Sequence, residues 1–526
     1  MSIVAPALRP LAHRPHRRHV ANALAALLAA ALVFSAGCAG RSSANGSRPA
    51  EAEGHAAEGS TTPRANTRAD GPAADLSQEL SGGNGAFMGS LATQGLAELG
   101  YIETELVASG NAVRYDPGPG WASDGNWSFA EVDEAAAPYR TRALVRRPAA
   151  AADFSGTVVI EWLNVSAGLD ADPEWSNLHE ELIRAGHAWV GLSTQLIGVE
   201  GGPVLVSVPG TEGIVGRGLV NTDASRYGSL EHPGDGYSFD IFTQVARAVR
   251  EGEGLGGQEP QLVLAAGESQ SAMALVTYHN GVQPLTGAFD GFFIHSRASM
   301  ALPVVGPDEY ADLASAFGST PVRLRGDLDV PVMVLQAEGD VTGLLNSSAS
   351  RQPDGENIRQ WEVVGTAHAD QRLVGAVTSL LDCGVAINDG PMHVAAKAAF
   401  HHFEAWTRGE KPPPSAPPIE LVEESPTPAI HRDGDGIALG GVRLAPVDVP
   451  VEVLSGEPGP SGEIMCQLLG STIPLPAEQL AERFSTVADY TAAYDAEVER
   501  DVAAGHLLDA DREAMSEYMR MERLGG

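Results

Sequence analysis

The stretch that most constrains this chain is Gln261–Ser271, where the apolar run Leu262–Ala266 stops at Gly267 and a helix-forming sequence begins just after Ser269. The pattern predicts a strand, a sharp turn and a helix, with a serine at the apex. In such a turn the hydroxyl is exposed above the helix N-terminus, which is the geometry of a nucleophile elbow. Gly267 lets the turn come close to the strand, and Ser271 is small enough for the position where such elbows usually carry another glycine.

Strands and helices alternate on both sides of this turn. The run 157–165 is almost continuously apolar, as in a strand that is covered on both faces. By contrast, 101–108 and 139–145 alternate or nearly alternate apolar with polar residues and are candidates for edge strands. Further strands are predicted at 187–193, 289–296, 330–336 and 360–364, and helices at 175–185, 239–250 and 392–407. This alternation specifies right-handed crossovers and an α/β fold, with a mostly parallel central sheet and helices on both faces.

The order of segments predicts one large domain with additions. We assign 1–37 to a signal peptide, 38–84 to a disordered tether, 85–409 to the catalytic domain and 410–526 to a C-terminal extension. The Gly- and Pro-rich segment 196–235 is too long for an ordinary connection and is expected to form a cap or rim insertion. The extension follows a Pro-rich link and is predicted to contain helices at 477–484, 487–504 and 510–521, packed on the catalytic domain.

The N-terminus has the pattern of an export signal. Its first twenty residues carry arginines and no acid, and the uncharged run Val20–Gly40 follows. Ser35-Ala-Gly-Cys38 resembles a lipoprotein box, which predicts lipidation of Cys38; ordinary cleavage and an uncleaved anchor are the alternatives. From Ala39 to Asp75 no large apolar residue occurs, which favours a flexible tether. The sequence thus predicts an exported protein, either a cell-surface lipoprotein or a secreted one, that meets the membrane only through an N-terminal lipid anchor.

Composition excludes some partners. The chain has 34 Lys and Arg against 68 Asp and Glu, a net charge of -34, which argues against a nucleic-acid partner. No Cys/His group has metal-ligand spacing, and no Gly-rich phosphate loop or dinucleotide fingerprint follows a strand. We therefore predict neither a metal nor a cofactor.

An acid and a histidine follow at later strand ends. Asp340 comes four residues after the predicted strand that ends at Gln336, and His368 lies just past the strand after it. The order Ser269, Asp340, His368 is that of α/β-hydrolases, and a serine needs such a base and orienting acid to become a nucleophile. Each residue has a plainer interpretation: Asp340 as a turn former with Glu338 as rival acid, and His368 as one of 15 histidines.

An acyl-transfer site also needs two donors for a developing oxyanion. One is expected to be the backbone N–H of Gln270, which follows the serine. The other is expected from the loop after the strand at 157–165, as the N–H of Asn164 or Val165, although Asn164 could merely cap a turn.

The two remaining cysteines are Cys383 and Cys466. In an exported chain an even pair favours a disulfide, here one that joins the extension to the catalytic domain. Two buried free thiols are the alternative.

Several longer motifs resemble one family. These are Glu161-Trp-Leu-Asn-Val-Ser, Arg226-Tyr-Gly-Ser-Leu-Glu-His-Pro-Gly-Asp, Phe239-Asp-Ile-Phe-Thr-Gln, Gly267-Glu-Ser-Gln-Ser-Ala and Asn388-Asp-Gly-Pro-Met-His. Together they resemble the bacterial alpha/beta hydrolase domain-containing proteins, from about Tyr101 to the C-terminus. The resemblance implies an alpha/beta-hydrolase fold and esterase activity, without a substrate.

These observations predict an exported serine hydrolase that cleaves a small-molecule carboxylic ester through an acyl-enzyme. An amidase or peptidase is an alternative with the same residues. A non-catalytic binding lipoprotein on the same scaffold is an alternative of another class. The sequence does not indicate an oligomeric state.

Overall fold

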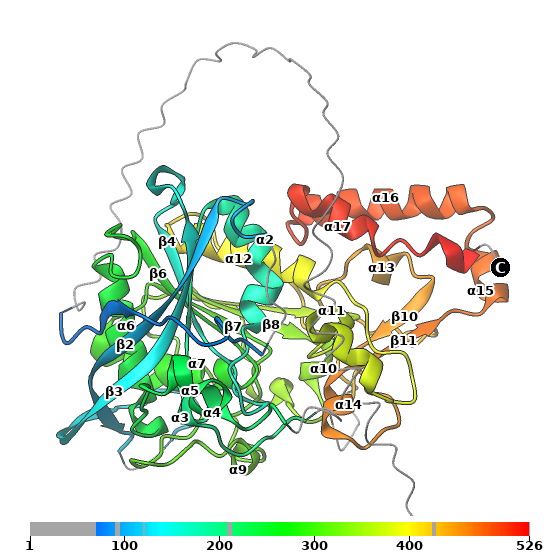
Figure 1. Ribbon diagram of the computed structural model, residues 1–526. Coiled ribbons are helices and arrows are strands. Elements are labelled where there is room, and N and C mark those ends of the chain that lie inside the picture. Colours follow the sequence, from blue (N-terminus) through cyan, green and yellow to red (C-terminus); the bar gives the residue numbers. More distant parts are fainter. Residues whose placement is uncertain (1–69, 90–94, 119–120, 208–212, 423–427, 525–526) are drawn as a thin grey trace, which may run out of the picture. The chain divides into compact units, whose positions relative to one another are not determined.

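The computed structural model describes residues 70–526 except 90–94, 119–120, 208–212, 423–427 and 525–526 (Figure 1). The predicted signal peptide, Cys38 and the tether up to residue 69 lie outside the described residues. Within the described ranges, no helix combines the length and the apolar character needed to cross a membrane.

Nine strands form the main sheet, and their order across it is β1-β2-β3-β5-β4-β6-β7-β8-β9. β1, β2, β3 and β5 pair antiparallel, while β5, β4, β6, β7, β8 and β9 pair parallel. The bounds are β1 Asp75–Glu79, β2 Tyr101–Asp116, β3 Ala130–Pro148, β4 Thr157–Trp162, β5 Ala188–Leu192, β6 Leu262–Glu268, β7 Gly291–His295, β8 Val332–Ala337 and β9 Ile358–Val363. The predicted α/β class with a mostly parallel sheet is therefore confirmed.

Helices cover both faces of this sheet (Figure 1). The main covering helices are α2 Pro173–Ala185, α6 Ser238–Arg250, α7 Gln270–Thr277 and α12 Met392–Thr407. Shorter helices are α3 Leu196–Glu200, α4 Gly218–Thr222, α5 Ala224–Tyr227, α8 Gln283–Thr286, α9 Leu313–Ala316, α10 Glu338–Val341 and α11 Gln371–Val374. Apolar side chains of α6 and α7 pack on one face, and those of α2 and α12 on the other.

The central strands are apolar throughout because both of their faces are covered. In β6, Val263 and Ala265 belong to the core under α6 and α7, while Leu264 and Ala266 belong to the core under α2 and α12. Side chains alternate along a strand, so two covered faces require an unbroken apolar run. This is the pattern from which the strand was predicted.

The extension packs on the main sheet's second face. Its elements are α13 Ala445–Asp448, β10 Glu452–Ser455, α14 Ile464–Leu468, β11 Ser471–Pro474, α15 Ala477–Arg483, α16 Val487–Ala504 and α17 Arg512–Ser516, with β10 and β11 forming a separate antiparallel pair. Tyr490 and Tyr494 of α16 share one apolar core with Trp361 of β9 and Phe403 of α12. The extension therefore shares an apolar core with the domain that contains the main sheet.

Three predictions about segments need correction, and two strands of the extension were missed. The tether does not reach residue 84, because β1 pairs with β2 and both Leu76 and Leu80 are buried. β2 and β3 are not edge strands, because β1 covers the edge that they would have formed. The helix predicted at 510–521 is limited to α17, and β10 and β11 were not predicted.

The segment 196–235 contains three short helices in its described part. Val199, Leu219 and Tyr227 form a small apolar cluster with residues of β2 and the chain just after β1. The N–H groups of Leu205 and Val206 both donate to the carbonyl of Ser166, at 3.0 Å. This part of the segment thus contacts the loop that follows β4.

Candidate active site

Ser269 occupies a sharp turn between β6 and α7. Its φ of 63° and ψ of -116° are unfavourable for a residue with a side chain, and such conformations persist where the surrounding structure imposes them. The backbone N–H of Ser269 donates to the carbonyl of His295 on β7, at 3.0 Å. A Cβ on Gly267 would lie 2.9 Å from the Cβ of Ser271, so the turn needs a glycine before the serine and a small residue after it.

The side chains of Ser269, His368 and Asp340 form a chain of hydrogen bonds. His368 Nε2 is 2.8 Å from Ser269 Oγ, and His368 Nδ1 is 2.7 Å from Asp340 Oδ1. Asp340 is fully buried in α10, directly after β8, and His368 lies in the loop after β9. Asp340 Oδ2 also accepts the N–H of Ala337, at 2.7 Å, which fixes the orientation of the carboxylate.

This arrangement sets the protonation of His368. Burial disfavours the imidazolium, but the neighbouring Asp340 carboxylate outweighs burial and raises the pKa of His368 above its ordinary value. A carboxylate at Nδ1 holds the imidazole in the tautomer whose Nε2 can accept a proton from the serine. The three groups are therefore arranged to activate the Ser269 hydroxyl.

Glu338, the rival acid, faces away from His368. Its Oε1 accepts hydrogen bonds from Arg432 at 2.7 Å, Ser455 Oγ at 3.0 Å and the Gly456 N–H at 2.9 Å. Its Oε2 accepts the Gly365 N–H at 2.8 Å. Glu338 thus connects the extension to the ends of β8 and β9, and the structure does not bring it to the imidazole.

The predicted oxyanion donors differ in their availability. Gln270 is the first residue of α7, where a backbone N–H has no acceptor within the helix. The N–H of Asn164 donates to the Ala171 carbonyl at 2.9 Å, so the prediction of this donor was wrong. The N–H of Val165 donates to the Gln270 side-chain oxygen at 3.3 Å, a long bond that another acceptor could replace.

Asn164 instead shapes the loop through its side chain. Its Oδ1 accepts the Ser166 N–H at 2.8 Å, and its Nδ2 donates to the Glu268 carbonyl at 3.1 Å. This agrees with the plainer interpretation that Asn164 caps a turn. It also ties the loop after β4 to the residue before the serine.

The extension contacts the loops that carry Asp340 and His368. These contacts were not predicted from the sequence. The N–H of Ala369, next to His368, donates to the Leu468 carbonyl at 3.1 Å. Gly456 lies so close to the acid loop that a Cβ on it would be 2.1 Å from the Gly339 nitrogen. Asn388 Nδ2 donates to Gly365 at 3.0 Å and to Ser455 at 3.1 Å, joining the His368 loop to β10. The long Asn388 motif was a signal for this role.

Cys383 and Cys466 form a disulfide, with their Cα atoms 5.4 Å apart and a sequence separation of 83. Both are buried in a small apolar cluster with Leu469. The bridge links α14 of the extension to the segment before α12, next to the His368 loop.

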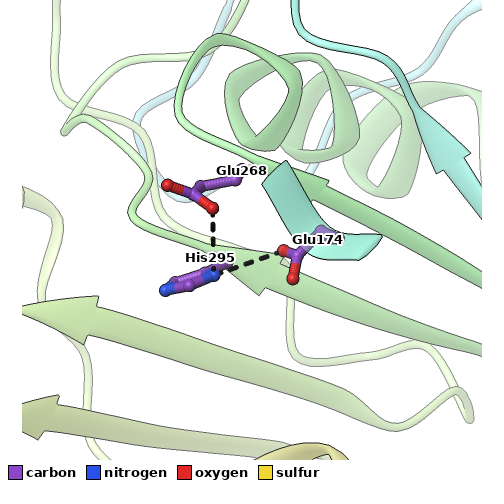
Figure 2. A group of neighbouring side chains, drawn as sticks. All are labelled: Glu174, Glu268 and His295. Atoms are coloured by element: carbon purple, nitrogen blue, oxygen red, sulfur yellow. Dashed lines mark ion pairs between the residues drawn. The ribbon is translucent and has the colours of Figure 1, made fainter. Parts of the chain in front are cut away.

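Glu174, Glu268 and His295 are the one group of described residues whose side chains are placed to hold a metal ion (Figure 2). Glu268 directly precedes Ser269. The three residues were not predicted as ligands, because they are far apart in the sequence.

Comparison with known proteins adds the family. The family model described as "Alpha/beta hydrolase domain" matches residues 69–517. No curated protein sequence matches the chain.

Among solved structures, the chain is similar to an α/β serine hydrolase without a lid from Xanthomonas campestris (12% identity, 57% of this chain and 94% of that chain, TM-score 0.27). It is also similar to Est1E from Butyrivibrio proteoclasticus (10% identity, 52% of this chain and 96% of that chain, TM-score 0.29). A third similar structure is an esterase of Rhizomucor miehei (12% identity, 57% of this chain and 85% of that chain, TM-score 0.26). Because the family model matches most of its length and the sheet has the expected mostly parallel order, the chain belongs to the alpha/beta hydrolase domain family.

Proposed function

We propose that this protein is an exported serine hydrolase that cleaves a small-molecule carboxylic ester through an acyl-enzyme. The observation that carries the proposal is the chain of hydrogen bonds from Asp340 through His368 to Ser269, which follow the parallel strands β8, β9 and β6. A scaffold used only for binding has no need for a strained serine with an aligned base and acid.

In the proposed reaction, His368 Nε2 takes the proton of Ser269 as the serine oxygen attacks the ester carbonyl. Asp340, held by the Ala337 N–H, stabilises the imidazolium that forms. The negative oxygen of the tetrahedral intermediate is bound by the N–H of Gln270, and by that of Val165 once it leaves the Gln270 side chain.

The imidazolium then protonates the leaving alcohol, and the acyl group stays on Ser269. A water molecule, deprotonated by the same imidazole, attacks the acyl-enzyme; the bond to Ser269 Oγ breaks, the imidazolium returns its proton to that oxygen, and the carboxylic acid leaves. The reaction needs no group beyond the triad, the two N–H donors and water.

A network of glutamines supports the second donor. Gln270 Nε2 donates to Gln195 Oε1, which also accepts from Trp162 Nε1 at 3.0 Å, and Gln195 Nε2 donates to Asp235 at 3.1 Å. All four side chains are buried. The network therefore holds the Gln270 side chain, and with it the loop at Val165, in one position.

The nucleophile can be tested by fluorophosphonate labelling of the full chain. Wild type should be labelled, and Ser269→Ala should lose both labelling and ester turnover, by about 10⁴-fold or more in kcat. Ser271→Ala is the matched control, because Ser271 is two residues away, is buried and has no hydrogen-bond partner for its Oγ among the described residues. Labelling that survives Ser269→Ala would refute the assignment.

The substrate class can be tested with p-nitrophenyl esters of increasing acyl length beside the matching anilides. Turnover of esters with little turnover of anilides supports the esterase, and the reverse would assign an amidase. Export and the lipid anchor rest on the N-terminal pattern, and labelled palmitate incorporated into wild type but not into Cys38→Ala would support them. A chain that stays in the cytoplasm would contradict them.

A further inference from the structure

Three ionisable side chains meet behind the Ser269 turn (Figure 2). Glu268 and His295 are partners in the parallel register of β6 and β7, as are Ala266 and Phe293 two residues earlier. Because side chains alternate, all four point to the face under α2 and α12, opposite to α7. Glu174 reaches the same point from the first turn of α2.

The three side chains are buried, and several of their polar atoms have no hydrogen bond. Glu174, Glu268 and His295 expose 0%, 3% and 1% of their surface. Among the described residues, both carboxylate oxygens of Glu174 and both ring nitrogens of His295 have no hydrogen-bond partner. Buried polar groups in folded proteins are nearly always paired, so these atoms indicate a ligand between them.

The distances match metal coordination better than hydrogen bonding. His295 Nδ1 is 3.4 Å from Glu174 Oε1 and 3.5 Å from Glu268 Oε2, and the three ligand atoms lie within 4.8 Å of one another. An ion with bonds of about 2.0 to 2.2 Å to tetrahedral ligands separates those ligands by about 3.3 to 3.6 Å. Hydrogen bonds between such groups are about 2.7 to 3.2 Å long.

The local charge also favours a cation. Glu161, fully buried nearby, accepts the N–H of Glu174 at 2.9 Å, and Asp172 is paired with Arg146 at 2.7 Å. With His295 neutral, as a metal ligand must be, the two carboxylates and the imidazole carry a charge of -2, which one divalent ion would neutralise. The position of Glu268 is fixed in addition by Asn177, whose Nδ2 donates to Glu268 Oε2 at 3.1 Å.

We propose that Glu174, Glu268 and His295 bind one divalent transition-metal ion, for which Zn²⁺ is the best match, with water completing its coordination. Two carboxylate oxygens and one imidazole nitrogen are a ligand set that zinc accepts. The ion ties the start of α2 to the ends of β6 and β7. Since Glu268 directly precedes Ser269, the ion is a structural support for the nucleophile turn and takes no part in the reaction.

The full chain, unfolded in chelator and refolded with ZnCl₂ or CoCl₂, tests the proposal. After desalting, elemental analysis should find one zinc per chain, and the cobalt form should show visible absorption from the bound ion. Glu174→Gln and His295→Gln should each lower the bound metal at least tenfold. His279→Gln is the matched control, because His279 is equally buried, at 1% exposure, but contacts Phe292, whose side chain belongs to the core on the other face of the sheet.

Wild type refolded with zinc that retains no ion, or cobalt without visible absorption, would overturn the proposal, whether or not the variants fold. Retention of the ion by both cluster variants would also overturn it. Fluorophosphonate labelling of Ser269 in the same samples reports the proposed hydrolase separately. A labelled chain without metal refutes the metal site alone.

Discussion

Glu338 and Asp340 are two residues apart, but changes at the two positions should affect different properties of the protein. Glu338→Gln should lower stability and spare catalysis, while Asp340→Asn should abolish catalysis. The reason is that Asp340 contacts His368, whereas Glu338 accepts hydrogen bonds from the extension and from the loop after β9.

The size of the stability loss follows from the contacts. The amide oxygen of a glutamine can keep the three contacts that Glu338 Oε1 makes, but its NH₂ group then faces the N–H of Gly365. One hydrogen bond to a charged group is lost, and Arg432 loses its ion pair with Glu338 while it keeps the one with Glu457. At about 1.5 to 3 kcal/mol for a bond to a charged group, we expect the free energy of unfolding to fall by about 3 kcal/mol.

A loss of this size is better measured by urea unfolding than by thermal unfolding. At about 2.1 cal/mol/K per residue, 3 kcal/mol would lower Tm by only about 3 °C in a protein whose described residues run, with short gaps, from 70 to 524. With a urea m-value of about 4 kcal/mol/M for a unit of this size, the midpoint would move by about 0.7 M, which is easily measured.

Activity is measured on the same samples in the folded baseline. Glu338→Gln should keep kcat within a fewfold of wild type, and Asp340→Asn should lose about 10⁴-fold in kcat. A folded Glu338→Gln protein with a loss as large as that of Asp340→Asn would refute the assignment of the acid. An unchanged urea midpoint would refute the stabilising role of Glu338.

Three further changes test other parts of the structure. Removing the bridge with Cys383→Ala and Cys466→Ala should lower the free energy of unfolding by about 4.5 kcal/mol, which is the loop-entropy value for a sequence separation of 83. Two alkylated cysteines in unreduced wild type would contradict the bridge. The value of kcat/KM should fall as pH drops, because only neutral His368 accepts the serine proton. The midpoint should lie above the ordinary histidine pKa of about 6.5, because Asp340 raises the pKa of His368. A midpoint below 6 would contradict this. Asn164→Ala should lower kcat about tenfold with little change in KM, because the loop after β4 loses the 2.8 Å hydrogen bond from the Ser166 N–H to Asn164 Oδ1. A change confined to KM would contradict a role of Asn164 in shaping this loop.

Elements with strong periodicity or unbroken apolar runs could be predicted from the sequence. The helix at 392–407 was predicted with the bounds that the structure has, and the strand at 262–268 was predicted because both of its faces are covered. β1 was missed because Asp-Leu-Ser-Gln-Glu contributes mainly its backbone to the sheet and buries only Leu76. β10 and β11 have four residues each, too few to show a period.

Within the site, the sequence located the residues that follow strands. Ser269, Asp340 and His368 could be found because parallel strands place their C-terminal ends at one edge. Whether the Asn164 N–H is free depends on its bridge to Ala171, which no local pattern encodes.

The cluster behind the serine could not be read from spacing either. Glu268 and His295 are neighbours because of the register between β6 and β7, and α2 adds Glu174 from 94 positions before Glu268. Register and helix placement are properties of the folded sheet.

The contacts of Gly456 and Leu468 with the acid and base loops have a consequence for the timing of activity. Both residues are synthesised after β9, so a nascent chain that has completed all nine strands of the main sheet still lacks part of the support for His368. We expect the enzyme to become active only after its C-terminal segment has been synthesised and folded. Hydrolysis would then report that the segment with Gly456 and Leu468 is present, and a chain cut before it by premature termination or proteolysis would be silent even though its serine, histidine and aspartate are all present.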